Sequence, residues 1–101
     1  MKITIYPTVE DILYAFGAAQ KTNKFIKSQI MKTGCWGFIE DDVIHVFYNR
    51  KASKEDLLEL ITHELTHTCF EYIRDENEED FCTIIARLAK QASQMVEKIT
   101  A

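Results

Sequence analysis

The spacing of hydrophobic and polar residues divides the first third of the chain into a strand and a helix. Polar residues alternate with β-branched and aromatic ones over residues 2–6, which predicts a short strand that ends at Pro7. Apolar residues then recur at helical intervals and predict a helix over residues 9–32, with Gly34 as its stop. Thr22 and Asn23 mark a place where this helix is expected to bend or break.

Residues 35–40 and 43–49 predict two strands joined at Asp41 and Asp42 as an antiparallel hairpin. Pairing around that turn sets Ile39 opposite Ile44 and Phe38 opposite His45. One face of the hairpin then carries Ile39, Ile44, Val46 and Tyr48, and the other carries Trp36, Phe38, His45 and Phe47. Because both faces are largely apolar, we expect the sheet to be covered on both sides or to bind a ligand on one.

Two more helices are predicted in the second half of the chain. Ser53, followed three residues later by Asp56, is typical of a helix start, and the helix runs to residue 73. A polar turn over residues 74–77 precedes a helix over residues 78–99. The predicted order is β-α-β-β-α-α in one domain over residues 1–101. The expected fold class is α+β, with a three-stranded sheet packed on helices.

Composition narrows the classes of function. The chain has 101 residues, 47% of them hydrophobic, and a net charge of −4 without a basic cluster, which argues against nucleic acid as a partner. It has no apolar run of about 18 residues for a membrane span and no signal-peptide pattern at its start. An odd number of cysteines, none in a C-x-x-C pair, predicts reduced thiols and a cytoplasmic location. Cys69 and Cys82 fall on apolar helix positions, where small buried side chains or a thiolate ligand are the two interpretations.

The strongest chemical signal is the sequence H-E-L-T-H, in which His63 and His67 are separated by four residues and Glu64 follows the first histidine. On a helix, side chains four residues apart lie on one face, so both imidazoles can reach one metal ion. Glu64 is rotated by about 100° from His63, which places it beside the metal instead of on it. Zinc held in this way beside a carboxylate is typical of a hydrolytic site.

The motif and the run E-E-D-F-C-T-I-I-A-R-L over residues 78–88 resemble the small zincin-type metallopeptidases of phages and bacterial mobile elements. They are more distantly similar to ImmA/IrrE-type peptidases and to minigluzincins. The resemblance implies a gluzincin-like zinc site with His63 and His67 as ligands and Glu64 as general base. It also implies a zincin-like fold, in which the motif helix follows a small sheet, and a third ligand from the next helix.

Glu79 is the preferred third ligand, followed by Glu78 and then Glu76. The same acids would also complement the dipole of the helix that they begin. Tyr48 or His45 is a candidate donor to the oxyanion or contact to the substrate, and His45 is also a candidate ligand.

The resulting expectation is a metallopeptidase with one Zn²⁺ per chain that hydrolyses a peptide or protein substrate, with the hairpin edge as a site for an extended peptide. The alternative is a catalytically silent zincin-fold protein that binds a host protein, as a phage-type inhibitor or adaptor, with a structural or vestigial metal site. A third hypothesis is a latent enzyme whose site is blocked by self-association or by a chain terminus, and an oligomer is compatible with any of these.

Overall fold

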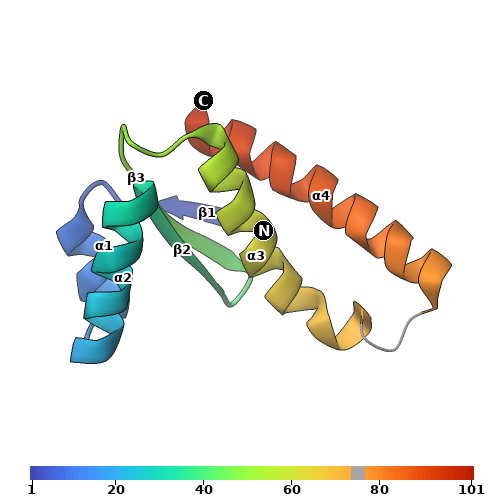
Figure 1. Ribbon diagram of the computed structural model, residues 1–101, viewed down its shortest axis with the longest axis horizontal. Coiled ribbons are helices and arrows are strands. Elements are labelled where there is room, and N and C mark those ends of the chain that lie inside the picture. Colours follow the sequence, from blue (N-terminus) through green and yellow to red (C-terminus); the bar gives the residue numbers. More distant parts are fainter. Residues whose placement is uncertain (74–76) are drawn as a thin grey trace.

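A computed structural model describes residues 1–73 and 77–101 of the chain (Figure 1). Within them, three strands and four helices form a small α+β domain. Their bounds are β1 (Lys2–Ile5), α1 (Val9–Phe16), α2 (Gln20–Thr33), β2 (Cys35–Glu40), β3 (Val43–Tyr48), α3 (Lys54–Ile73) and α4 (Glu78–Thr100).

The three strands form one mixed sheet in the order β1-β3-β2. β1 pairs with β3 in parallel, whereas β2 and β3 form the expected antiparallel hairpin. The hairpin register sets Ile39 opposite Ile44 and Phe38 opposite His45, which confirms the pairing predicted from the turn. β1 and β2 are therefore the two edge strands of this sheet.

The hairpin turn requires an unusual backbone conformation. Asp41 and Asp42 both have positive φ angles, 51° and 61°. Two consecutive left-handed residues form the type I′ turn, whose twist matches that of paired strands. Aspartate tolerates this conformation better than most residues, but glycine adopts it without strain.

Helices cover both faces of the sheet, which confirms one of the two interpretations of its apolar faces (Figure 1). The face formed by Ile39, Ile44, Val46 and Tyr48 packs on α3 and α4. Phe47 on the other face packs on buried residues of α1 and α2, namely Ile12, Ile26 and Ile30. The sheet therefore lies between two hydrophobic cores.

The single helix expected over residues 9–32 is wrong, because the chain forms two helices there. α1 ends at Gly17, whose N–H donates to the Leu13 carbonyl at 2.7 Å. Asn23 does not break the second helix. Its side-chain amide donates to the Gly17 carbonyl at 3.1 Å and so stabilises the break that precedes it. The element order is therefore β-α-α-β-β-α-α, and the motif lies on the third helix.

The expected start of α3 is confirmed. Asp56 N–H donates to the Ser53 hydroxyl at 3.0 Å, and Ser53 N–H donates to the Asp56 carboxylate at 3.3 Å. This reciprocal pair satisfies two backbone donors at the helix start. It fixes where α3 begins and thus which face of the helix each later residue occupies.

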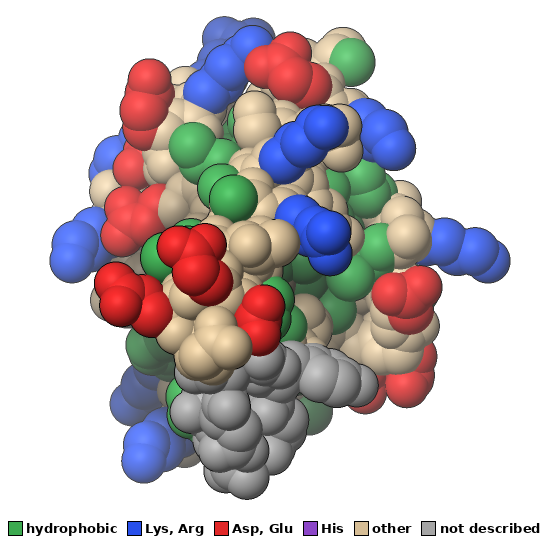
Figure 2. All heavy atoms as spheres, turned by 90° about the vertical axis from the view of Figure 1, so that its right-hand side faces the viewer, with side chains coloured by type: hydrophobic (Ala, Val, Ile, Leu, Met, Phe, Trp, Pro, Cys, Tyr) green, Lys and Arg blue, Asp and Glu red, His purple; other side chains and the backbone are tan. Residues whose placement is uncertain are grey.

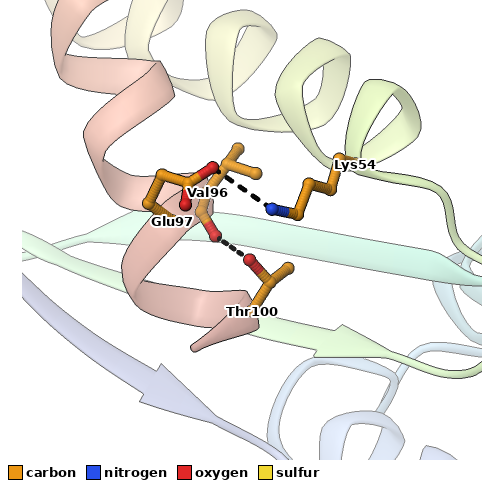
Figure 3. A network of polar contacts seen from close by, with 4 residues as sticks. All are labelled: Lys54, Val96, Glu97 and Thr100. Carbon is orange, nitrogen blue, oxygen red and sulfur yellow. Dashed lines mark hydrogen bonds and ion pairs between the residues drawn. The ribbon is translucent and has the colours of Figure 1, made fainter.

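α4 is held against the rest of the molecule by its C-terminal half. Lys54 at the start of α3 pairs with Glu97 at 3.3 Å, next to the bond from the Thr100 hydroxyl to the Val96 carbonyl (Figure 3). The Tyr48 hydroxyl donates to the Ile99 carbonyl at 2.9 Å. In contrast, the side chains of α4 before Leu88 are exposed or only partly buried.

Figure 2 shows the end of the molecule near the start of α4, where apolar side chains lie exposed between acidic and basic ones. Phe81 and Ile85 of α4 are 42% and 37% exposed. Basic side chains on this face are interspersed with acidic ones and do not form a single patch. Over the described residues, α1 to α4 include no segment with both the length and the apolar character of a transmembrane helix.

We expect the turn between β2 and β3 to respond in opposite directions to two substitutions of Asp42. Asp42→Gly should relieve the cost of the positive φ, whereas Asp42→Ala should increase it, with a difference of about 1 kcal/mol in the free energy of unfolding. Both variants lose the same carboxylate, so the comparison isolates the backbone effect. Urea unfolding measures it, and equal stabilities would contradict the left-handed turn.

Candidate functional site

α3 places the two motif histidines one above the other on an exposed face. Both His63 and His67 are exposed, and their ring centroids lie 4.7 Å apart. Their Nε2 atoms approach to 3.1 Å. This distance suits a hydrogen bond from the N–H of one ring to the lone pair of the other. It therefore confirms that the i, i+4 spacing makes the two imidazoles converge.

The same geometry fits two ligands of one zinc ion. Two nitrogen atoms bound to zinc at about 2.0–2.1 Å with a tetrahedral angle lie about 3.3 Å apart. The observed separation of the two Nε2 atoms, 3.1 Å, is close to this value. The imidazoles can therefore serve as a ligand pair with little movement.

Glu64 lies on a different side of α3, half-buried between the helix and β2. Burial raises the pKa of its carboxyl group, and the neighbouring His63 and His67 oppose this shift. The backbone N–H of Ile39 in β2 also favours the charged carboxylate and lowers its pKa, to a smaller extent. A carboxyl group with a raised pKa is a better proton acceptor than an ordinary glutamate.

Two surface depressions meet at His63. The first, here called the helix groove, runs along the exposed face of α3 and contains both histidines. It is lined by Glu55, Leu58, Glu59, Thr62, His63, Thr66, His67 and Phe70. Because all these residues belong to one helix, the groove leaves the histidine pair open to solvent.

The second depression, here called the edge cleft, lies between α2, β2 and α3 and has a volume of about 580 Å³. It contains His63 and Glu64 but not His67. Its lining residues are Phe25, Gln29, Lys32, Thr33, Cys35, Trp36, Asp56, Glu59, Leu60, His63 and Glu64. The edge cleft therefore brings one histidine and the candidate base to an edge of the sheet.

β2 directs part of its backbone toward the edge cleft. Because the two-residue turn makes Glu40 and Val43 a hydrogen-bonded pair, alternate residues of β2 direct their N–H and C=O groups away from β3. The outward groups belong to Cys35, Gly37 and Ile39. The Thr33 hydroxyl bonds both groups of Cys35, and Ile39 faces Glu64. Gly37 lies between these two positions and is buried, so this part of the edge is not open to an added strand.

The expected third ligand is not grouped with the histidines. Glu78 and Glu79 are exposed in the first turn of α4, and Asp80 binds Asn77, the cap of that helix. Among the described residues, no three His, Cys, Asp or Glu side chains are grouped closely enough to hold a metal ion. Glu76, the other candidate ligand, lies outside the described residues.

His45 and Tyr48 do not line the helix groove or the edge cleft. His45 is on the sheet face that packs on α1, where its Nδ1 is 2.9 Å from the Tyr6 hydroxyl and its ring contacts Phe16. Tyr48 uses its hydroxyl to bind the Ile99 carbonyl. The structure thus gives both residues packing partners away from the histidine pair.

Sequence reasoning missed Glu59, which lines both the helix groove and the edge cleft. The signal was present, because Glu59 precedes His63 by four residues and so shares its helical face. Phe25 and Gln29 were also missed as cleft residues. No local pattern connects them to the motif, because they approach it only when α2 packs beside β2.

The three cysteines occupy different environments. Cys35 is buried, Cys69 is half-buried against the α3–α4 core, and Cys82 is exposed, so the expectation of a buried Cys82 is wrong. α4 has not yet reached the core at this position, so its apolar face remains uncovered there. Desolvation and the carboxylates of Asp56 and Glu59 raise the pKa of the Cys35 thiol, although a bond from Thr33 opposes them.

We expect iodoacetamide at pH 8 to modify Cys82 first and Cys35 at least about tenfold more slowly, because the thiolate is the reactive species and burial disfavours it. Peptide mass spectrometry measures the rate for each cysteine. In denaturant the difference between the two cysteines should disappear. Equal rates in the folded protein would contradict the burial of Cys35.

No family model, no curated protein and no solved structure matches this chain. The geometry nevertheless defines a pair of converging imidazoles, a half-buried carboxylate beside them, and an adjoining cleft at a sheet edge. These three features can bind a metal ion, accept a proton and hold part of a ligand.

Proposed function

We propose that this protein is a zinc-dependent metallopeptidase in which His63 and His67 bind the metal and Glu64 transfers protons. The observation that supports this proposal best is the approach of the two Nε2 atoms to 3.1 Å. When bound, zinc supplies a Lewis acid that polarises a carbonyl group and makes a neighbouring water more acidic.

Glu64 is suited to accept the proton of the attacking water. Its carboxylate lies in the edge cleft, whereas the histidine rings are directed to the exposed side of the helix. Burial raises the pKa of the Glu64 carboxyl group, which makes its carboxylate a stronger proton acceptor. The same carboxyl group, once protonated, can give the proton to the departing amine.

The edge cleft supports a peptide as the substrate. The edge of β2 itself is not open to an added strand, because Gly37 is buried and both backbone groups of Cys35 are bonded to Thr33. A peptide is therefore held by the side chains that line the cleft, which include His63 and Glu64. Its scissile bond then lies near the proton acceptor.

The third ligand in this proposal comes from the acidic run at the start of α4, with Glu79 preferred and Glu78 and Glu76 as the alternatives. The described positions of Glu78 and Glu79 are in the exposed first turn of α4. Metal affinities of the three single Gln variants identify the ligand, because only its loss leaves the metal with two protein ligands.

The absence of a group of three ligands among the described residues favours a second candidate function, a catalytically silent binding protein. Such a protein uses the edge cleft to hold a segment of a partner, and the histidine pair is vestigial or structural. The two candidates differ in metal content and in turnover.

We expect the purified protein to bind one equivalent of zinc and His67→Ala to lose it, because the site then keeps only one imidazole and one carboxylate. His45→Gln is the matched control, since His45 is directed to the opposite face of the sheet and bonds Tyr6. Elemental analysis after dialysis measures the zinc content. Zinc retained by His67→Ala, or lost equally by His45→Gln, would contradict the assignment of the ligands.

Glu64→Gln should retain zinc and lose about 10²–10⁴-fold in turnover, because the amide cannot accept a proton. A screen with a mixed peptide library, read by mass spectrometry, measures the turnover. Glu10→Gln in α1 controls for the loss of one negative charge, since it is exposed on the far side of the sheet. Unchanged turnover in Glu64→Gln would remove this mechanism.

A further inference from the structure

The histidine pair of α3 supplies only half of a zinc coordination sphere. Zinc prefers four ligands arranged as a tetrahedron. The Nε2 atoms of His63 and His67, which lie 3.1 Å apart, can provide two of them. Among the side chains that the structure describes, no third His, Cys, Asp or Glu is grouped with this pair. A zinc ion at the pair therefore remains open to ligands from outside the chain.

Glu59 does not complete the site, although it lines the helix groove together with both histidines. An ion between His63 and His67 lies about 9 Å along the helix axis from Glu59, since each residue advances the helix by about 1.5 Å. This separation exceeds the length of a glutamate side chain, and a zinc–oxygen bond adds only about 2 Å. The exposed face of α3 thus offers one pair of ligands and no third.

The helix groove leaves the histidine pair accessible to a second protein molecule. Its described lining residues all belong to α3, so the pair lies on the surface of one helix. Leu58 and Phe70 flank the histidines along the groove and are 39% and 54% exposed. Apolar side chains that adjoin a site at this exposure favour a surface that is covered in a complex. A second copy of α3 presents the same two imidazoles and the same apolar side chains.

We propose that one zinc ion joins two copies of this chain, each of which gives His63 and His67 to a four-imidazole site. Two-fold symmetry places the same surface of both copies at the interface, so the two helix grooves face each other. Four nitrogen ligands complete the tetrahedron. The inference rests on the proposed zinc site and adds its regulation. Because no coordination position is left open, the paired chains are the latent form of the proposed peptidase.

The ratio of zinc to protein determines which form is present. With half an equivalent of zinc or less, two copies share each ion. With excess zinc each chain takes an ion of its own, and the copies separate by mass action. The net charge of −4 on each copy opposes association in the absence of metal, so we expect the metal-free protein to be a monomer.

Sedimentation velocity during a zinc titration tests the inference. We expect the dimer fraction to reach its maximum at half an equivalent of zinc, to fall with excess zinc, and to disappear when a chelator is added. A phosphine reductant is present throughout, because the exposed thiol of Cys82 can otherwise form a disulfide between two chains. A dimer that forms without zinc, or that persists in the chelator, would overturn the zinc bridge.

His67→Ala should weaken zinc-dependent dimerisation at least about 100-fold, because the loss of one imidazole from each copy leaves zinc with two of its four ligands. His45→Gln is the matched control and should dimerise as the parent does, since His45 bonds Tyr6 and does not line the groove. Dimerisation of His67→Ala at the parent's zinc concentration would contradict the four-imidazole site.

Phe70→Ser should weaken the zinc-dependent dimer about fivefold, because both copies lose apolar surface at the interface. Phe81→Ser changes an exposed phenylalanine of α4 that does not line the groove, and it should alter the dimer affinity by less than about twofold. Equal effects of the two substitutions would overturn the placement of the groove at the interface.

The outcomes also separate this inference from the proposed function. One equivalent of zinc bound to a monomer throughout the titration would overturn the bridge and leave the peptidase site intact. A zinc-bridged dimer whose separated chains show no turnover would support the bridge and remove only the hydrolase. Protein that binds no zinc would remove both.

Discussion

The close packing of α3 on β2 is the contact on which the rest of the site depends. Gly37 suits this contact, because a Cβ atom at this position would crowd the His45 carbonyl of β3 at 2.9 Å and would touch Leu60 of α3 at 3.4 Å. The helix therefore lies directly against an edge strand. This contact brings Glu64 to Ile39 and forms one side of the edge cleft.

The same packing separates the tasks of the motif residues. The core-facing side of α3 carries the buried residues Leu57, Ile61 and Leu65, which hold the helix on the sheet. The histidines occupy the exposed side, where a metal ion and water have access, and Glu64 lies between the two environments. Partial burial changes the acidity of Glu64, whereas the histidine rings remain free to converge. A single helix thus combines a structural face, a metal-binding face and a proton-accepting residue.

The two halves of α4 differ in how firmly they are packed against the rest of the molecule. Its C-terminal half is fixed by buried apolar residues, by the ion pair with Lys54 and by the bond from Tyr48. Its N-terminal half has the same apolar periodicity, but Phe81 and Ile85 remain exposed, because the start of α4 lies further from α3 than its C-terminal half does (Figure 1). The acids that the sequence offers as a third ligand lie on this less supported half.

The sequence by itself determined what depends on neighbours along the chain. Helical spacing predicted that the histidine rings converge, Ser53 and Asp56 predicted the start of α3, and alternation around Asp41 and Asp42 predicted the register of the hairpin. These features are local because caps, turns and i, i+4 pairs involve residues a few positions apart.

Only the tertiary structure decided which distant elements meet. It brought Phe25 of α2 and Glu59 of α3 to one cleft, turned His45 toward Tyr6, and left Glu79 outside any described group of metal-ligating side chains. It also moved the helix break to Gly17, where the bond from Asn23 acts across the turn. Such arrangements follow from how buried faces pack against each other. A periodic pattern in the sequence shows which face of a helix is buried, but it does not show which element packs against that face.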